Sequence, residues 1–193
     1  MKESLLLPIL RSQTQGDLLA LLFLNPEKEI TISDAARTIG VSIPGLHHEA
    51  VRLIEAGFVR QRREGRNRLI RAETNSRIAP ALIDLLALTY GPLPVLEREL
   101  AGLKGVTAAY IYGSWAARYR GKPGAIPNDI DLLVIGTVSL DSLDHVSDRA
   151  EKVLGREVNI RRISAKEWSQ CSPFIATIKK NPFAVQWNKH TGC

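Results

Sequence analysis

The sequence predicts an α+β protein made of two unlike parts. The first half is typical of short helices followed by a pair of alternating strands, whereas strands and helices alternate along the second half. Between them, Gly91-Pro92-Leu93-Pro94 combines residues that interrupt helices. We therefore place a boundary there and predict one domain over residues 1–91 and a second over residues 92–193.

Apolar periodicity and breaker residues define the individual elements. Apart from the segments treated below, helices are predicted over Gln13–Leu24, Ile78–Tyr90, Val95–Leu103, Ser114–Tyr119, Leu140–Leu154, Ala165–Gln170 and Pro173–Asn181. Extended segments are predicted over Glu29–Thr31, Val106–Tyr112, Asp129–Ile135 and Glu157–Ile163. The second domain should therefore hold a mixed sheet with flanking helices. Three large aromatic residues are expected in the core or at a domain interface: Trp115, Trp168 and Trp187.

Two short helices joined by a tight turn are predicted between residues 34 and 56. Ser33 is expected to cap the first helix, Asp34–Ile39, and Gly40 suits the left-handed conformation that ends it. Ser42 is expected to cap the second helix, which has Pro44 in its first turn. Side chains able to contact phosphates and base edges would then point outward: Ser42, Pro44, Gly45, His47, His48 and Arg52.

A basic β-hairpin is predicted directly after these helices. Its strands are Phe58–Glu64 and Arg68–Ala72, and Gly65-Arg66-Asn67 supplies the turn. Six arginines stand against the single acid Glu64, and they are Arg60, Arg62, Arg63, Arg66, Arg68 and Arg71. Arginine binds phosphate well because its planar guanidinium group donates two parallel hydrogen bonds. From this hairpin we select Arg62, Arg66, Asn67 and Arg68 as DNA-binding residues.

Helices at this spacing followed by a hairpin predict a winged helix-turn-helix. The segment Ile32–Ala72 resembles the ArsR-like regulators through Ala35–Ser42, Val51–Val59 and Glu64–Arg68. The resemblance implies binding to double-stranded DNA as a homodimer, because two copies read a palindromic site together. Metal sensing is not implied, since no cysteine lies in these helices. Two alternatives stay open: the arginines form only a solvated face, or the domain binds another protein.

Composition indicates an intracellular protein that favours an anionic partner. The net charge is +6 and the sequence pI is about 9.5. Cys171 and Cys193 lie far apart in the sequence, so a disulfide scaffold is not expected and the cytoplasm is the predicted location. We expect no membrane span and no secretory signal, because the apolar run Leu5–Leu10 is short and contains Pro8.

The second domain carries an acidic pair close to a glycine-serine step. Gly113 and Ser114 end a strand and open a helix, and Asp129 and Asp131 open the next strand. Residues two apart on a strand share a face, so both carboxylates project side by side, as a divalent metal requires. The backbone N–H groups at the start of the helix suit a phosphate. The alternative from the residues alone is that the aspartates cap the strand or pair with arginines such as Arg118 and Arg120.

Tyr112-Gly113-Ser114 followed by Asn128–Val134 resembles the DNA polymerase beta-type nucleotidyltransferases, close to their minimal members. The resemblance implies that Gly113 and Ser114 hold the triphosphate of ATP or another nucleotide. It also implies that Asp129 and Asp131 hold Mg²⁺. The family uses a third carboxylate on a later strand, but Asn159 occupies that position here. Glu157, on the same face, is the candidate to replace it in catalysis.

Two functions follow from these patterns. The first is a DNA-binding transcriptional regulator whose second domain binds nucleotide and Mg²⁺. The alternative is an active nucleotidyltransferase anchored to DNA by the first domain. It would transfer a nucleotide to a protein or another acceptor, and a partner toxin is one such acceptor because minimal nucleotidyltransferases occur as antitoxins.

Overall fold

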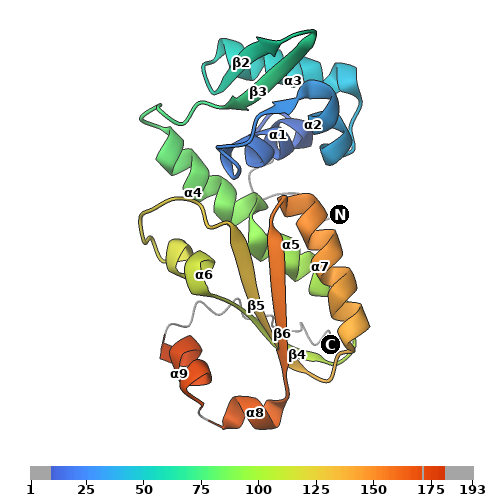
Figure 1. The fold of residues 1–193 in the computed structure, drawn as a ribbon, viewed down its shortest axis with the longest axis vertical. Helices are drawn as coiled ribbons and strands as arrows, with labels where there is room; N and C mark the ends of the chain where they lie inside the picture. The colour runs from blue at the N-terminus through green and yellow to red at the C-terminus, as the bar shows by residue number, and fades with distance from the viewer. Residues whose placement is uncertain (1–9, 171, 181–193) are drawn as a thin grey trace. The chain divides into compact units, whose positions relative to one another are not determined.

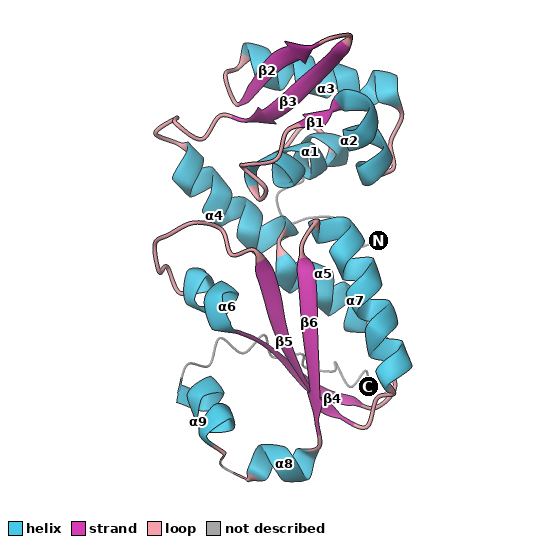
Figure 2. Ribbon diagram, in the orientation of Figure 1, coloured by secondary structure: helices cyan, strands magenta, loops and turns pink. Residues whose placement is uncertain are grey.

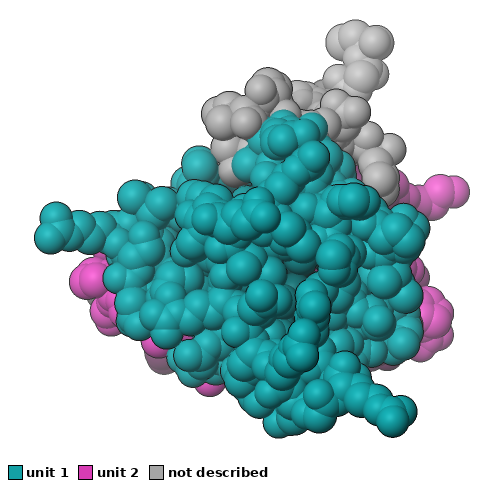
Figure 3. All heavy atoms as spheres, turned by 90° about the horizontal axis from the view of Figure 1, so that it is seen from above, with its two compact units in different colours: residues 1–91 teal, residues 92–193 magenta. Residues whose placement is uncertain are grey.

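The structure, a computed structural model, describes residues 10–170 and 172–180 (Figure 1). Expectations for residues 1–9, Cys171, Asn181, Trp187 and Cys193 lie outside the described residues. The chain divides into two compact units, residues 1–91 and residues 92–193 (Figure 3). Each unit contains both helices and a sheet (Figure 2), so the predicted α+β class is confirmed.

The first unit packs four helices against a small antiparallel sheet. The helices are α1 (Gln13–Phe23), α2 (Ile32–Ile39), α3 (Ile43–Glu55) and α4 (Ala79–Tyr90). The strands are β1 (Ile30–Thr31), β2 (Val59–Glu64) and β3 (Asn67–Ala72), in the order β1-β3-β2. The core of this unit is apolar, and its most deeply buried side chains include Leu18, Leu22, Phe23, Leu46, Ile70 and Leu86.

The predicted cap of α2 is wrong. Thr31, not Ser33, is the N-cap: its hydroxyl accepts a hydrogen bond from the N–H of Asp34 at 3.1 Å. Ser33 is an exposed residue inside the helix, and Ile32 is buried in its first turn. Strand β1 therefore passes into α2 without a connecting loop, because Thr31 has extended backbone angles and serves both elements.

The turn between α2 and α3 forms as the glycine and serine predict. Gly40 ends α2 at φ +80°, and the Ser42 hydroxyl caps α3 by accepting from the N–H of Gly45 at 3.3 Å. Leu46 and Leu53 are buried on the inner face of α3. The small Ala35 and Ala36, both buried, face the same core from α2. The outer face of α3 is thereby left to solvent.

The hairpin turn is one residue shorter than predicted. Asn67 is the first residue of β3 and pairs with Glu64, so only Gly65 and Arg66 form the loop. Gly65, the first loop residue, has φ +58°. Arg66, the second, has a negative φ, as every described non-glycine residue does. A positive φ at the first position only is the pattern of a type II′ turn. The two-residue loop fixes the register of β2 and β3 and hence the face on which each arginine lies.

The break between the units is also shorter than Gly91-Pro92-Leu93-Pro94 suggests. Helix α5 (Pro92–Leu100) begins at Pro92, since a proline in the first turn loses no hydrogen bond there. Together α4 and α5 form the stretch Ala79–Leu100, which is the one segment among the described residues that is long and apolar enough to cross a membrane. We had expected no such segment from the sequence. A core helix passes the same test, and both helices bury residues inside their own units, among them Leu86 and Leu96.

The second unit is a mixed sheet with helices on both faces. Its strands are β4 (Val106–Tyr112), β5 (Asp129–Gly136) and β6 (Glu157–Ile163), in the order β4-β5-β6. Strands β4 and β5 are antiparallel, whereas β5 and β6 are parallel. The remaining helices are α6 (Gly113–Tyr119), α7 (Leu140–Leu154), α8 (Ala165–Ser169) and α9 (Pro173–Lys180).

Alternation along β5 divides the core of this unit into two layers. Ile130, Leu132 and Val134 lie on one face, and α5 and α7 bury their apolar sides in that layer. Leu133 and Ile135 lie on the other face, where α8 and α9 pack against them (Figure 1). The aspartates at the start of β5 belong to this second face. Trp115 is buried, and Trp168 is half-buried and stacks on Tyr110 with ring centroids 5.0 Å apart.

Candidate functional site

The hairpin separates its arginines onto two faces. In the pairing of β2 with β3, Arg63 lies opposite Arg68, and Arg60 lies opposite Arg71. Val59 and Ile70 are buried, and alternation puts Arg63 and Arg68 on their face of the hairpin. Sequence alone did not show which arginines share a face, because that depends on the register set by the turn.

The outer face of the hairpin is neutralised by acids of the same unit. Arg62 donates to Glu29 at 2.7 Å and to Glu64 at 3.1 Å, and Arg60 forms an ion pair with Glu73. The hydrogen bond from Arg62 holds the pKa of Glu29 below its usual range. Arg71 lies 4.0 Å from the same Glu29 carboxylate. The local excess of five positive charges in the sequence therefore falls to three in the fold.

The remaining arginines carry that excess. Arg63, Arg66 and Arg68 are exposed, and within the described part of the chain no acid forms an ion pair with them. Arg66 occupies the turn, and the other two are cross-strand neighbours on the inner face. We call these three residues the arginine tip. Arg62, selected from the sequence, lies outside it, and Arg63, which was not selected, belongs to it.

The outer face of α3 presents the other residues selected from the sequence. Ser42, Pro44, His47, His48 and Arg52 are all exposed. Arg52 pairs weakly with Glu49 at 3.5 Å, so its guanidinium group stays accessible. Asn67 is exposed beside the arginine tip. One exposed helix face and one cationic hairpin end thus occur in the same unit.

In the second unit, Asp129 and Asp131 lie on one face at the start of β5, as the alternation predicts. Asp129 is exposed and Asp131 is half-buried. The pKa of Asp131 is raised, mainly by burial and to a smaller extent by the negative charge of Asp129. Two neighbouring carboxylates in this position can serve as ligands for a cation.

Gly113 is required by its closeness to Asp131. Its φ is +68°, and a Cβ there would lie 2.7 Å from Oδ2 of Asp131. Tyr112, the preceding residue, is paired with Asp131 across the sheet, and burial together with that carboxylate raises the pKa of its hydroxyl. Ser114 is exposed in the first turn of α6. The glycine-serine step and the aspartates are therefore neighbours in space as well as in motif.

Within the described residues, no third carboxylate joins the aspartate pair in a metal-binding group. The parallel register sets Glu157 beside Asp129 and Asn159 beside Asp131, so all four residues share a face. Among the described residues, however, no group of three histidine, cysteine or acidic side chains can hold a metal ion. Glu157 thus does not join the two aspartates in a three-ligand group. The neutral amide of Asn159 is the polar neighbour of Asp131 instead.

Arginines fix the loop before β5 and do not neutralise the aspartates. Arg156 donates to the carbonyl of Pro127 at 2.7 Å, and Arg118 donates to the carbonyl of Gly124 at 3.0 Å. In the part of the chain that the structure describes, no ion pair joins an arginine to Asp129 or Asp131. The carboxylates keep their charge available for an external cation.

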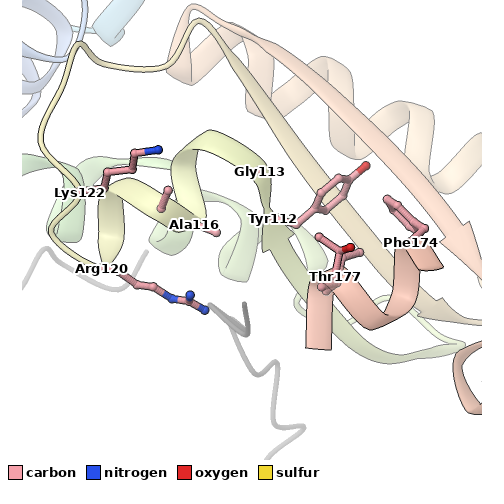
Figure 4. A pocket seen from close by; sticks show the side chains of 9 residues that line it. Tyr112, Gly113, Ala116, Arg120, Lys122, Phe174 and Thr177 are labelled. Carbon is pink, nitrogen blue, oxygen red and sulfur yellow. The ribbon is translucent and has the colours of Figure 1, made fainter. Parts of the chain in front are cut away.

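A cavity of about 470 Å³ lies against α6, and Gly113 is part of its lining (Figure 4). Tyr112 and Phe174 line it with aromatic rings, and Arg120 and Lys122 line it with positive charge. No sequence motif indicated this cavity, because α9 reaches α6 only through the tertiary fold.

No protein-family model matches the chain, and no curated protein matches it.

Proposed function

We propose that the first unit binds double-stranded DNA and that the protein is a transcriptional regulator. The observation that carries this proposal is the arginine tip, Arg63, Arg66 and Arg68, which has no acidic partner among the described residues. A guanidinium group without an internal partner is available for a phosphate, and each neutralised phosphate releases counterions.

The arrangement of α2, α3 and the hairpin supports the same proposal. It is compatible with a winged helix-turn-helix in which α3 enters the major groove and the hairpin follows the backbone. Ser42, His47 and Arg52 would then contact phosphates or base edges, since they are exposed on α3. Two copies bound to a palindromic site would give the specificity a regulator needs, so we propose a homodimer on DNA.

The test compares two triple variants that remove the same charge. Replacing Arg63, Arg66 and Arg68 with alanine should weaken binding to duplex DNA and lower the salt slope by roughly three units, close to one per lost phosphate contact. The matched control replaces Arg60, Arg62 and Arg71, whose guanidinium groups already pair with acids. Fluorescence anisotropy across a series of salt concentrations measures both quantities.

The control should lose much less affinity than the arginine-tip variant. Exposed ion pairs of this kind contribute about 0–1 kcal/mol each, so the control should also stay folded. Equal losses in both variants would reduce the effect to net charge and remove the hairpin end from the proposal. Unchanged affinity in the arginine-tip variant would reject DNA binding by this surface.

A second proposal concerns the aspartate pair in the other unit. We propose that Asp129 and Asp131 hold one Mg²⁺ ion, because two oxygen ligands share a face and the pKa of Asp131 is raised beside a like charge. The metal would neutralise the phosphates of ATP or another nucleotide placed at Gly113 and Ser114. The polymerase beta-type resemblance supports this assignment.

The residues fit one metal ion better than two. Asn159 is neutral, so it cannot accept a proton from an acceptor hydroxyl, and Glu157 does not form a three-ligand group with the aspartates. We therefore favour nucleotide binding over transfer. Transfer to a protein acceptor, such as a partner toxin, is the alternative, and it requires Glu157 to supply the third carboxylate.

A further inference from the structure

The cavity beside α6 belongs to neither the arginine tip nor the aspartate pair. Its volume of about 470 Å³ lies in the range of pockets that hold small molecules. We infer that it binds a small organic anion with a flat apolar body. This inference does not rest on DNA binding or on Mg²⁺, because no residue of either proposed site except Gly113 lines the cavity.

Positive side chains at one end of the cavity favour a ligand of negative charge. Arg120 and Lys122 lie at the end of α6 that is remote from Gly113 (Figure 4). None of the described residues that line the cavity is acidic. A ligand with one phosphate or carboxylate would place it at this end, since Lys122 donates charge-assisted hydrogen bonds.

The opposite end of the cavity is lined by aromatic rings, which favour a flat apolar group in the ligand. Tyr112 and Phe174 meet edge to face there, with ring centroids 5.4 Å apart. The guanidinium carbon of Arg161 lies 4.3 Å from the Phe174 ring centre and helps to fix that ring. Ala116 and Ala117 leave the flank of α6 smooth between the two ends. An aromatic ring fits such a surface better than a flexible polar chain.

The aspartate pair reinforces this orientation. Asp131 lies next to Gly113 but does not line the cavity. Its negative charge, together with that of Asp129, disfavours an anion at the Tyr112 end. The anionic group is thereby directed to Lys122 and the ring to Phe174. Two sources share this chemistry, a nucleoside monophosphate and an aromatic carboxylate.

The experiment is calorimetric titration of the full-length protein in EDTA with adenosine monophosphate and, separately, indole-3-carboxylate. We expect saturable binding of at least one probe without divalent metal. Lys122→Ala should weaken it about tenfold through loss of one charge-assisted hydrogen bond. Saturation by only one probe identifies whether phosphate or carboxylate is the preferred group. No saturable binding of either probe would overturn the inference.

Two further variants localise the ligand. Ala117→Leu fills the cavity and should weaken binding at least tenfold, whereas Ala101→Leu, an exposed alanine outside the cavity, should not. Asp131→Asn should not weaken metal-free binding, because it removes a negative charge that disfavours the anion. Binding that is lost in Asp131→Asn but kept in Lys122→Ala and Ala117→Leu would assign the ligand to the aspartate pair and reject the cavity. Circular dichroism establishes that each variant is folded.

Discussion

Asp131 is held where its own negative charge is disfavoured. It is half-buried, it has Asp129 on the same face, and Gly113 brings backbone against its carboxylate. Both burial and the neighbouring charge raise its pKa. A bound cation would offset this unfavourable negative charge, so the surroundings of Asp131 favour a metal-binding role.

We predict that Mg²⁺-dependent ATP binding strengthens with pH. A carboxylate with a raised pKa is protonated over a wider acidic range, so the metal must compete with a proton there. Affinity should fall as the pH drops through the raised pKa of Asp131 and reach a plateau above it. Calorimetry of ATP with Mg²⁺ over a pH series measures this dependence.

Variants separate this site from other acids. Asp131→Asn should abolish the Mg²⁺-dependent part of ATP binding together with its pH dependence, whereas Asp148→Asn, an exposed acid on α7, should change neither. If Asp131→Asn binds Mg²⁺-ATP like the unaltered protein, the aspartate pair is not the metal site.

At the scale of elements, the hairpin places its paired arginines and those unpaired within the described residues on different faces. Alternation along β2 and β3 sends Arg60, Arg62 and Arg71 to a face that carries acids, and Arg63 and Arg68 to the other. A slip of one residue would exchange the two faces. The two-residue turn at Gly65 prevents that slip, so the position of one glycine governs the electrostatics of the whole hairpin.

We predict that Gly65→Ala destabilises the protein by about 1–2 kcal/mol, because a side chain at positive φ is strained. No atom lies within 4 Å of the added Cβ, so the strain is in the backbone alone. Arg66→Ala, next to it in the turn at negative φ, should change stability by less than about 0.5 kcal/mol. Urea unfolding followed by circular dichroism compares the two; equal stability would argue against a strained turn.

At the scale of the whole molecule, each unit has a hydrophobic core of its own. Leu46, Ile70 and Leu86 are buried in the first unit, and Leu132 and Leu133 in the second. The boundary falls between Gly91 and Pro92. Separate cores allow separate unfolding, so the proposed DNA and nucleotide sites can be perturbed one at a time.

We predict two calorimetric unfolding transitions. Leu86→Ala should destabilise the first unit and Leu133→Ala the second, each by about 2–5 kcal/mol through the cavity that the lost side chain leaves. Each substitution should lower the midpoint of one transition only. A single transition that both substitutions shift equally would mean that the units unfold together.

The order and type of nearly all elements could be predicted from local sequence signals. Gly40 and Ser42 define the turn between two helices through backbone preferences that act within a few residues, and the apolar run of β5 is equally local. The errors arose at the ends of elements. Thr31 ends a strand and caps a helix at once, and Pro92 opens a helix directly after the break.

The sequence by itself determined the α+β class, the basic hairpin and the alignment of Asp129 with Asp131, because these depend on periodicity along one segment. Only the tertiary structure decided which arginines are neutralised, since Glu29 and Glu73 reach them from other segments. It alone brought Phe174 to α6 to form the cavity. Charge pairing and cavities depend on contacts between distant segments, and no local pattern encodes those contacts.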